Sequence, residues 1–407
     1  MFFAPQSIIN FINISVEVQT VRDKLSVLKE YFGHDSFREG QDRITDSLLG
    51  GRDVLGIMPT GAGKSICYQV PALMFDGITI VVSPLISLMK DQVSALVQSG
   101  VAAAYINSSL THAQYLKVLQ NTESGKYKII YVAPERLCAP AFLGICRNLN
   151  ISMVAVDEAH CVSQWGQDFR PSYLKIPDFI DALNSRPVVG AFTATATGAV
   201  RDDIKTLLRL VSPLVVTTGF DRPNLFFSVM QPKNKSIELM KLIKERKNES
   251  GIVYCSTRKA VEEVCELLQK NGFAATRYHA GLDENERRRT QDDFVYDRAT
   301  IMVATNAFGM GIDKSNVSFV IHYIMPKNME SYYQEAGRAG RDGRSADCIL
   351  LYSAKDVRTN QFLINNSEPT PDLTEDEQEE VRRRDRERLQ QMTFYCTTHK
   401  CLRKFIL

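Results

Sequence analysis

Short apolar runs alternate along this chain with longer segments in which apolar residues recur at helical spacing. The first series of apolar runs comprises DVLGIM, GITIVVSP, YKIIYVAP, ISMVAVDEAH and VVGAFTATAT. A second series comprises SGIVYCST, TRYHAG, TIMVATN, VSFVIHYIMP and DCILLYS. Apolar runs of this length, separated by helix-length segments, are typical of parallel strands that are buried on both faces. The pattern therefore predicts two α/β domains, each a parallel sheet covered by helices.

The N-terminal end departs from this alternation. Residues 1–20 are poorly patterned and are interpreted as an extension. Apolar residues between Val21 and Phe32 recur at helical spacing and stop at Gly33, which predicts an amphipathic helix at the start of the folded part.

The two series of strands meet near the segment TTGFDRPNL. We therefore expect a first domain over residues 21–215 and a second over 216–356. The tail, residues 357–407, contains TEDEQEEVRRRDRERLQQ, in which opposite charges lie three and four residues apart. Such pairs favour a solvated helix, and the alternative, a DNA-binding arm, is disfavoured because the acids cancel the arginines locally.

The composition is that of a globular chain, with 44% hydrophobic and 24% charged residues. A net charge of +2 means that any surface for nucleic acid must be local. The nine cysteines are scattered, some within apolar runs, which indicates a reducing cytosol instead of a disulfide framework. We expect no signal peptide and no membrane span, because the chain has no basic leader and no apolar run of about 18 residues.

The segment IMPTGAGKSICYQ has the composition of a phosphate-binding loop. Gly61 and Gly63 let backbone N–H groups converge on an anion, Lys64 adds a charge, and the Ser65 hydroxyl can ligate Mg²⁺. Met58 stands where the strict pattern has its first glycine. A tight strand-to-helix turn is the alternative, but the apolar strand before the loop and the apolar helix after it favour a phosphate site.

Two further motifs carry matching chemistry. Asp157 and Glu158 follow an apolar strand, where the Asp can hold Mg²⁺ and the Glu can position and deprotonate a water, although acids there can also be helix N-terminal charges. The segment YYQEAGRAGRDG supplies Arg338 and Arg341, whose planar guanidinium groups suit the oxygens of a transferring phosphoryl group. If such an arginine comes from the second domain, hydrolysis requires the two domains to close.

In their order along the chain, these motifs resemble those of the RecQ family of superfamily 2 helicases over about residues 25–355. The resemblance also covers FGHDSFREGQ, VVSPLISLMKDQV, APERL, AFTATAT, VYCSTRK and VATNAFGMGIDK. It implies two tandem RecA-like domains and ATP and Mg²⁺ as cofactors. It further implies that Arg38 and Gln41 contact the adenine and that His34 stacks near it. The other implied ligands of the nucleotide and its Mg²⁺ are Thr60, Gly61, Gly63, Lys64, Ser65, Asp157 and Gln334.

The segment CVSQWGQDFRPSY separates this family from other DEAH-bearing helicases. Trp165, Phe169 and Arg170 suit the stacking of single-stranded bases, at roughly 1–3 kcal/mol per base. The resemblance implies that this loop couples DNA binding to hydrolysis. The alternative is that Trp165 packs in a core. Gln167 stands where the family often has His, so a contact that depends on His is in doubt.

The strand-end loops supply further candidates for DNA contacts, which the resemblance places at Ser83, Arg136, Thr257, Arg258 and His279. Their short polar groups and charges suit phosphate binding without sequence preference. Each can instead be an ordinary strand-end cap. The segment TATAT is expected to link the ATP site to the DNA path through Thr193 and Thr195.

The resemblance implies a 3′-to-5′ DNA helicase or translocase that acts on single-stranded and partially duplex DNA in recombination and repair. We expect a monomer in the bacterial cytosol, or in the nucleus of a eukaryote, with repair proteins as possible partners. The final FYCTTHKCLRKFIL resembles the start of a zinc region, in which only Cys401 matches a ligand. Cys396, His399 and Cys401 together would still lack a fourth ligand, so no zinc is expected. A translocase that does not separate strands, an inactive binding module and an RNA helicase stay open as alternatives.

Overall fold

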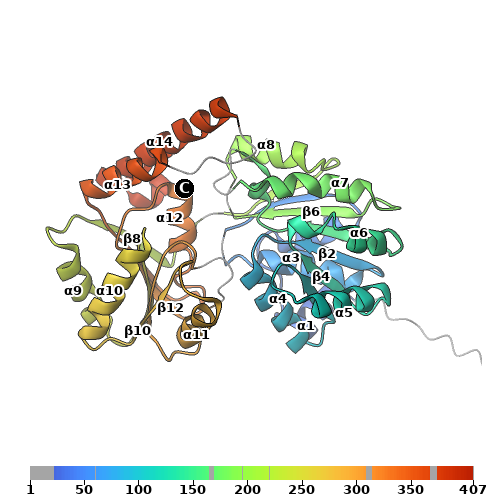
Figure 1. The fold of residues 1–407 in the computed structure, drawn as a ribbon, viewed down its shortest axis with the longest axis horizontal. Coiled ribbons are helices and arrows are strands. Elements are labelled where there is room, and N and C mark those ends of the chain that lie inside the picture. Colours follow the sequence, from blue (N-terminus) through green and yellow to red (C-terminus); the bar gives the residue numbers. More distant parts are fainter. Residues whose placement is uncertain are drawn as a thin grey trace, which may run out of the picture.

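The computed structural model describes residues 23–59, 61–164, 169–194, 196–219, 221–308, 314–366 and 374–406. Figure 1 shows two lobes, each built around one sheet with helices packed over it, and the C-terminal helices lie on the second lobe. The predicted α/β fold with two parallel sheets is therefore confirmed. The expectations for residues 1–20 and for Thr60, Trp165 and Thr195 fall outside the described residues.

The first lobe contains a seven-stranded sheet in the order β3-β4-β2-β5-β6-β1-β7, and every neighbouring pair is parallel. Its strands are β1 (Val54–Ile57), β2 (Ile78–Val82), β3 (Ala103–Ile106), β4 (Ile129–Val132), β5 (Ile151–Val156), β6 (Val188–Thr193) and β7 (Leu214–Thr217).

The second lobe contains a six-stranded parallel sheet in the order β10-β11-β9-β12-β13-β8. Its strands are β8 (Leu225–Met230), β9 (Ser250–Tyr254), β10 (Ala275–Tyr278), β11 (Ile301–Ala304), β12 (Val317–His322) and β13 (Ala346–Leu351).

Helices connect the strands and cover the sheets (Figure 1). In the first lobe they are α1 (Lys24–Phe32), α2 (Gln41–Leu49), α3 (Lys64–Met74), α4 (Ile86–Gln98), α5 (His112–Glu123), α6 (Pro140–Arg147), α7 (Ile176–Asp181) and α8 (Gly198–Leu207), with short 3₁₀ turns at η1 (Pro134–Arg136), η2 (Ala159–Val162) and η3 (Pro171–Lys175). In the second lobe and tail they are α9 (Lys235–Glu245), α10 (Arg258–Lys270), α11 (Glu284–Val295), α12 (Met329–Ala336), α13 (Ala354–Asn365), α14 (Glu375–Thr397) and α15 (Leu402–Ile406).

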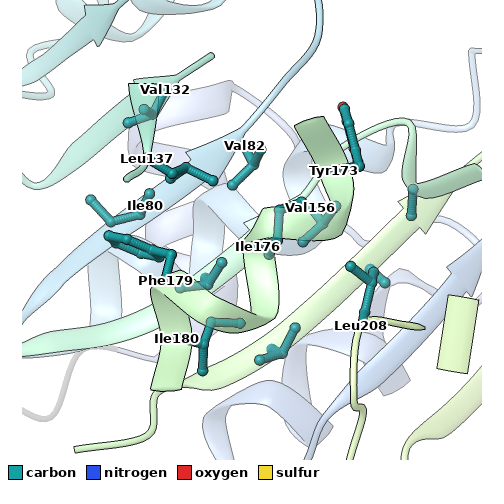
Figure 2. Close-up of a cluster of buried hydrophobic side chains, with 14 of the residues drawn as sticks. Ile80, Val82, Val132, Leu137, Val156, Tyr173, Ile176, Phe179, Ile180 and Leu208 are labelled. Carbon is teal, nitrogen blue, oxygen red and sulfur yellow. The ribbon is translucent and has the colours of Figure 1, made fainter. Parts of the chain in front are cut away.

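Both faces of each sheet are buried, as the continuous apolar runs predict. In the first sheet, Leu55 and Ile57 belong to the core on one face, while Val54 belongs to the core on the other. Figure 2 shows the first of these cores, where Phe179 and Ile180 of α7 lie among the strand side chains. Alternate residues of a strand point to opposite faces, so a run without polar interruptions can be stable only between two layers of helices.

The first helix ends where the sequence predicts. Gly33 has a φ of 69°, and its N–H donates to the Lys29 carbonyl, which caps α1. The buried residues of the helix are Val27 and Leu28, while Leu25 is 43% exposed. The buried face of the helix therefore includes Leu28 and leaves out Leu25.

Strands β3, β7 and β8 have no counterpart among the predicted apolar runs, and all three lie at edges of the sheets. Strand β7 pairs with β1 along its whole length, so the first sheet extends to Thr217. The boundary expected after residue 215 consequently falls inside a strand. It was misplaced because Val215 and Thr217 are exposed at the sheet edge and interrupt the apolar pattern.

The charged tail forms the expected helix but is only partly solvated. Arg383 of α14 pairs with Glu380 and Glu387, at 2.7 and 2.5 Å between nitrogen and oxygen. The second half of the helix, in contrast, buries Leu389, Met392, Tyr395 and Cys396 against the second lobe. The charged stretch up to residue 388 is thus an exposed or partly exposed helix, as expected, and the helix continues with apolar residues that pack against the second lobe.

All nine cysteines are free thiols, and all except Cys138 and Cys401 are buried. Among the described residues, no helix is both long and apolar enough to cross a membrane.

Candidate nucleotide site and strand-end loops

The order of the strands brings the predicted nucleotide motifs together. In the first sheet β5, β6 and β1 are neighbours and run in the same direction. The loop that leads to Lys64 follows β1, Thr193 ends β6, and Asp157 follows β5 directly. Because the carboxyl ends of parallel strands share one edge, motifs that lie far apart in the sequence meet at a single place.

The phosphate loop folds through two left-handed glycines. Gly61 has a φ of 85° and Gly63 a φ of 78°, a backbone region that residues with a side chain rarely adopt. A Cβ added at Gly63 would lie only 2.5 Å from Gln41 Nε2. Both positions therefore require glycine, as a loop that presents backbone N–H groups to an anion does.

Arg38 and Gln41, the expected adenine contacts, hold this loop from outside. Arg38 Nη1 donates to the Gly61 carbonyl at 2.7 Å, and Gln41 Nε2 donates to the carbonyls of Ala62 and Gly63 at 3.0 and 3.1 Å. Gln41 is 3% exposed, and His34 is exposed in the loop between α1 and α2. The three residues lie on the segment that supports the loop.

Lys64 begins helix α3, and Ser65 follows in its first turn, partly buried. Within the described part of the chain, no side chain caps this helix N-terminus, so its N–H groups remain directed at the loop. Lys64 Nζ donates to the Met58 carbonyl at 3.3 Å. A helix N-terminus, two left-handed glycines and a lysine together fit a phosphate group.

Asp157 and Glu158 lie at the end of β5. Asp157 is 5% exposed, and its N–H donates to the Val82 carbonyl at 2.9 Å. Burial and the neighbouring Glu158 carboxylate raise the pKa of Asp157 to about 7, while the Lys64 ammonium acts in the opposite direction. Such a buried carboxyl group fits a divalent cation, whose charge would favour the ionised form. Asp157 and Ser65 could hold it.

Glu158 has a φ of 47°, a left-handed conformation that is uncommon for a residue with a side chain. Its Oε2 atom is buried and has no hydrogen-bond partner among the described residues. This acceptor is available to a water molecule. The strained backbone is a feature that occurs often at functional sites.

Thr193 contacts the acidic motif through His160. His160 Nδ1 lies 2.8 Å from Thr193 Oγ1 and 3.4 Å from Glu158 Oε2. The Tyr173 hydroxyl, on η3, donates to the Asp157 carbonyl at 2.9 Å. These contacts connect the acidic motif, Asp157 and Glu158, to the end of β6 and to the last residue of the segment CVSQWGQDFRPSY, which we call the aromatic loop.

The two arginines of the second lobe have different environments. A Cβ added at Gly61 would lie 3.8 Å from Arg341 Cγ, so Arg341 lies across from the phosphate loop. Arg338 is 6% exposed and hydrogen-bonds to Tyr254 inside the second lobe. Gln334 lies on α12, partly buried. Of the two arginines, Arg341 is therefore the one placed beside the loop.

Arg222 is a site residue that the sequence interpretation missed. Its Nη1 atom lies 3.3 Å from the point that a Cβ at Gly61 would occupy. The same guanidinium group donates to the carbonyls of Gly337, Ala339 and Gly340, at 3.3, 3.0 and 2.8 Å. Arg222 lies in TTGFDRPNL, the linker between the two domains, which the sequence interpretation used only to place their boundary. A charged residue within this linker was the one sign in the sequence that Arg222 could belong to the site.

A cavity of about 360 Å³ lies between the lobes at this point. Its lining comes from the segment before α2, the phosphate loop, the linker and the loop after α12: Arg38, Glu39, Pro59, Gly61, Ala62, Thr218, Gly219, Asp221, Arg222, Asn224, Gly340, Arg341, Asp342 and Gly343. Lys64 and Asp157 do not line it. The cavity nevertheless brings both lobes to one place beside the phosphate loop.

The candidates for DNA contacts in the first lobe lie at strand ends. Ser83 follows β2 directly and is fully buried, and its Oγ atom has no hydrogen-bond partner among the described residues. Arg170 Nη1 donates to the Pro84 carbonyl at 3.0 Å. Phe169 and Arg136 are partly exposed. The Arg170 contact joins the aromatic loop to the loop after β2.

In the second lobe, Thr257 is the N-cap of α10, and its hydroxyl accepts from the Ala260 N–H at 3.2 Å. His279 is 5% exposed, with its Nε2 atom 2.7 Å from Glu262 Oε1. Arg258 is exposed beside Gly281. Arg258 is thus the candidate in this lobe with a charge open to solvent.

No group of three or more potential metal ligands occurs among the residues that the structure describes. In the tail, Cys396 is buried whereas Cys401 is exposed. These two sulfur atoms therefore lie in different environments.

Three family models match the chain in succession. They are described as DEAD/DEAH box helicase, over residues 38–204, helicase conserved C-terminal domain, over 234–343, and RecQ zinc-binding, over 354–407. The third match begins where the second sheet ends. It coincides with the tail helices α13 to α15.

Known relatives are similar over nearly the whole chain. The ATP-dependent DNA helicase RecQ of Bacillus subtilis (strain 168) is 48% identical over 383 residues, which cover 94% of this chain and 63% of that protein. A protein of Acanthamoeba polyphaga mimivirus, provisionally named an ATP-dependent RNA helicase, is 38% identical over 94% of this chain and 68% of its own. The chain thus spans less than two thirds of the Bacillus relative.

Among solved structures, Mycobacterium smegmatis helicase Lhr bound to ssDNA and AMP-PNP is similar with a TM-score of 0.67. The match has 18% identity and covers 84% of this chain and 50% of Lhr. At this identity the likeness concerns the fold alone, which is that of two tandem RecA-like domains.

Proposed function

Because this chain belongs to the RecQ family of ATP-dependent DNA helicases, we propose that it hydrolyses ATP between its two domains and uses the cycle to move along single-stranded DNA. We take the first domain to extend over residues 21–217 and the second over 218–356, followed by the tail.

The observation that carries this proposal is the position of Arg341 opposite Gly61. A phosphate loop in one domain and an arginine in the other are the two parts that a closing motor needs. An arginine supplied in this way contributes about 10³ to 10⁵ in rate. Hydrolysis then depends on how closely the domains approach, so it can be linked to movement.

We assign the catalytic roles as follows, with the geometry as support. Lys64 and the α3 N-terminus bind the phosphates, and Arg341, with Arg222 beside it, neutralises charge that develops on the outer phosphate. Asp157 and Ser65 would hold Mg²⁺, which would neutralise and polarise the phosphate oxygens. Glu158 positions the attacking water and accepts its proton.

Recognition of the base is assigned to Arg38 and Gln41, with His34 stacking beside it and Thr60 and Gln334 adding contacts. Support comes from the hydrogen bonds of Arg38 and Gln41 to the carbonyls of the phosphate loop. If the base formed hydrogen bonds with Arg38 and Gln41 in place of these carbonyls, the two side chains would no longer hold the phosphate loop in the same way. Binding of the base and ordering of the loop would then be coupled.

DNA binding is assigned to the strand-end loops and the aromatic loop. Arg136 and Arg258 supply charge for the phosphates, and Trp165, Phe169 and Arg170 stack on bases. Ser83, Thr257 and His279 contribute by shaping the loops that carry them. Translocation from 3′ to 5′ as a monomer, on single-stranded and partially duplex DNA in repair and recombination, is the finer part of the proposal and rests on the family.

The test is steady-state ATP hydrolysis with and without single-stranded DNA, together with displacement of a labelled strand. Duplexes with a 3′ or a 5′ overhang report direction, and single-stranded RNA of the same sequence tests the RNA alternative. We expect stimulation by DNA and displacement only from the 3′ overhang.

Each outcome separates two interpretations. Stimulation without displacement would indicate a translocase that does not separate strands. Equal stimulation by RNA would favour an RNA-dependent motor, and the absence of hydrolysis in every condition would contradict the proposal.

A further inference from the structure

The last helix of the tail contacts the linker between the domains. Arg403 of α15 donates through Nη1 to the Asp221 carboxylate and, at 2.8 Å, to the Arg222 carbonyl. Its Nη2 atom donates to the Leu225 carbonyl and, at 3.5 Å, to that of Pro223. One guanidinium group therefore joins successive residues of the linker.

The same linker segment holds the arginine loop, which we define as residues 337–344. Arg222 donates to three carbonyls of this loop, as described above. Asn224 Nδ2 donates to the carbonyls of Gly340 and Arg344, at 2.9 and 2.8 Å. Arg403 thus holds the backbone of the linker. The linker side chains Arg222 and Asn224 in turn hold the arginine loop.

Helix α15 is itself anchored to the second lobe. The Phe405 ring lies 5.6 Å from the Tyr395 ring and 5.7 Å from the Phe394 ring, measured between centroids. The Arg403 guanidinium lies 5.7 Å from the centroid of Phe227 on β8. These contacts hold α15, and with it Arg403, in place on the second lobe. The hydrogen bonds of Arg403 can therefore determine the position of the linker.

Arg403 also pairs with an acid of the cavity lining. Asp221 is one of the residues that line the cavity beside the phosphate loop. In the ion pair, the charge of Asp221 is balanced by a cation that comes from the tail.

We propose that Arg403 is a positioning residue for ATP hydrolysis, which sets the arginine loop against the phosphate loop through the linker. The inference rests on the proposed function, since it assigns to the tail a control over that same site. Arg403 lies in the segment that matches the RecQ zinc-binding model. The tail thereby communicates with the nucleotide without contacting it.

A guanidinium group is required at this position. It presents a planar fork of donors that can reach several carbonyl oxygens and a carboxylate together, whereas a lysine has one compact ammonium. Arg403→Lys keeps the charge but cannot reproduce this set of bonds. The pair Arg403→Ala and Arg403→Lys therefore separates the charge from the geometry.

The experiment measures kcat, KM for ATP and the melting temperature of the full 407-residue chain, with saturating single-stranded DNA. The variants are Arg403→Ala, Arg403→Lys and, as a matched control, Lys404→Ala, which removes an exposed charge from the same helix. We expect Arg403→Ala to lower kcat about tenfold with KM within about twofold, because hydrolysis needs Arg341 in place more than binding does. Arg403→Lys should recover only part of kcat, and Lys404→Ala should leave it unchanged.

The outcomes distinguish the two proposals. An inactive wild-type chain contradicts the proposed function itself. An active wild type with an unchanged Arg403→Ala variant overturns the inference and leaves the function standing. A variant whose melting temperature falls, while kcat of the folded fraction is unchanged, assigns Arg403 to stability alone and also overturns the inference.

Discussion

The residues assigned to the nucleotide and those assigned to DNA differ in the partners of their polar side chains. On the nucleotide side, Lys64, Arg38 and Arg222 donate to backbone carbonyls. Among the strand-end loops, His279 is paired with the Glu262 carboxylate, and Ser83 is buried. The cations of the first group donate to neutral acceptors. In the second group Arg170 also donates to a carbonyl, but His279 lies against an acid and Ser83 is removed from the surface.

This difference bears on what each side can bind. A carbonyl satisfies a donor without cancelling its charge, so the cations of the nucleotide side remain able to attract phosphate. Two of the three acids of the cavity lining are paired outward, Asp221 with Arg403 and Asp342 with Arg344, at 3.6 Å in the second case. The nucleotide side is therefore suited to an anion, whereas the DNA binding that we propose would depend on the few charges that remain open.

The largest effect expected is that of Lys64→Ala. The variant loses both the binding of the phosphates and the stabilisation of the transition state, so we expect kcat/KM for ATP to fall on the order of 10⁴-fold. The affinity for single-stranded DNA should stay within about twofold, because the two sides are separate. Hydrolysis assays and fluorescence anisotropy measure the two effects.

The control for this prediction is Lys126→Ala, which removes an exposed lysine away from the described motifs. It should change neither quantity. A Lys64→Ala variant that hydrolyses ATP normally would end the assignment of the phosphate loop. An equal loss of DNA affinity would instead show that the two sides act as one.

The two arginines of the second domain provide the next test. Arg341→Ala should lower kcat about 10³-fold with a small change in KM, since it removes an arginine that acts on the transition state. Arg338→Ala should leave kcat within about threefold but lower the free energy of unfolding by about 2 kcal/mol, because the variant cannot form the buried hydrogen bond to Tyr254. Kinetics and urea unfolding of both variants give the comparison.

The reverse pattern would contradict the geometry. If Arg338→Ala abolished hydrolysis at unchanged stability, the domains would have to rearrange so far that Arg338 replaces Arg341. Arg341→Lys serves as an additional variant, because it keeps the charge without the planar fork. It should recover little of kcat.

Strands buried on both faces were predictable from the sequence, whereas three of the four edge strands, β3, β7 and β8, were not. The run that contains Val54 and Ile57 is apolar throughout because helices cover both faces. In β8, by contrast, Phe226 is 67% exposed and only Leu225 is buried. Strand β3 begins with Ala103 and Ala104, which have little preference for strands. Pairing at a sheet edge depends on tertiary contacts, which the local pattern of apolar residues does not show.

The site shows a similar division. The phosphate loop and the acidic motif could be predicted because each is a short segment whose chemistry depends on neighbouring residues. Arg222 could not, because its role arises from the approach of Gly61 and Gly340, which are far from it in sequence. The difference between Arg338 and Arg341 was likewise hidden, since burial inside the second lobe decides it.

On the DNA side, the open charges of Arg136 and Arg258 can be tested together. Arg136→Ala combined with Arg258→Ala should weaken binding of single-stranded DNA several-fold. The slope of log K against log salt concentration should fall in magnitude by about 0.7 for each DNA phosphate that the variant no longer neutralises. Anisotropy titrations at a series of salt concentrations measure both quantities.

The control is Arg298→Ala, because Arg298 is exposed but paired with Asp293 at 2.7 Å. Its removal should leave the slope unchanged. If the double variant also leaves the slope unchanged, the phosphates are bound elsewhere, and the contrast between the two sides of the molecule would need a different explanation.

The smallest effect is expected at Thr257, where the capping role and the DNA role make opposite predictions. Thr257→Val removes the hydroxyl that accepts from Ala260, which should lower the free energy of unfolding by about 1 kcal/mol. Thr257→Ser keeps a capping hydroxyl and should restore that stability. If the cap is the only role, DNA affinity stays constant in both variants. A loss of affinity in Thr257→Val alone, at unchanged stability, would instead place this hydroxyl on the DNA path.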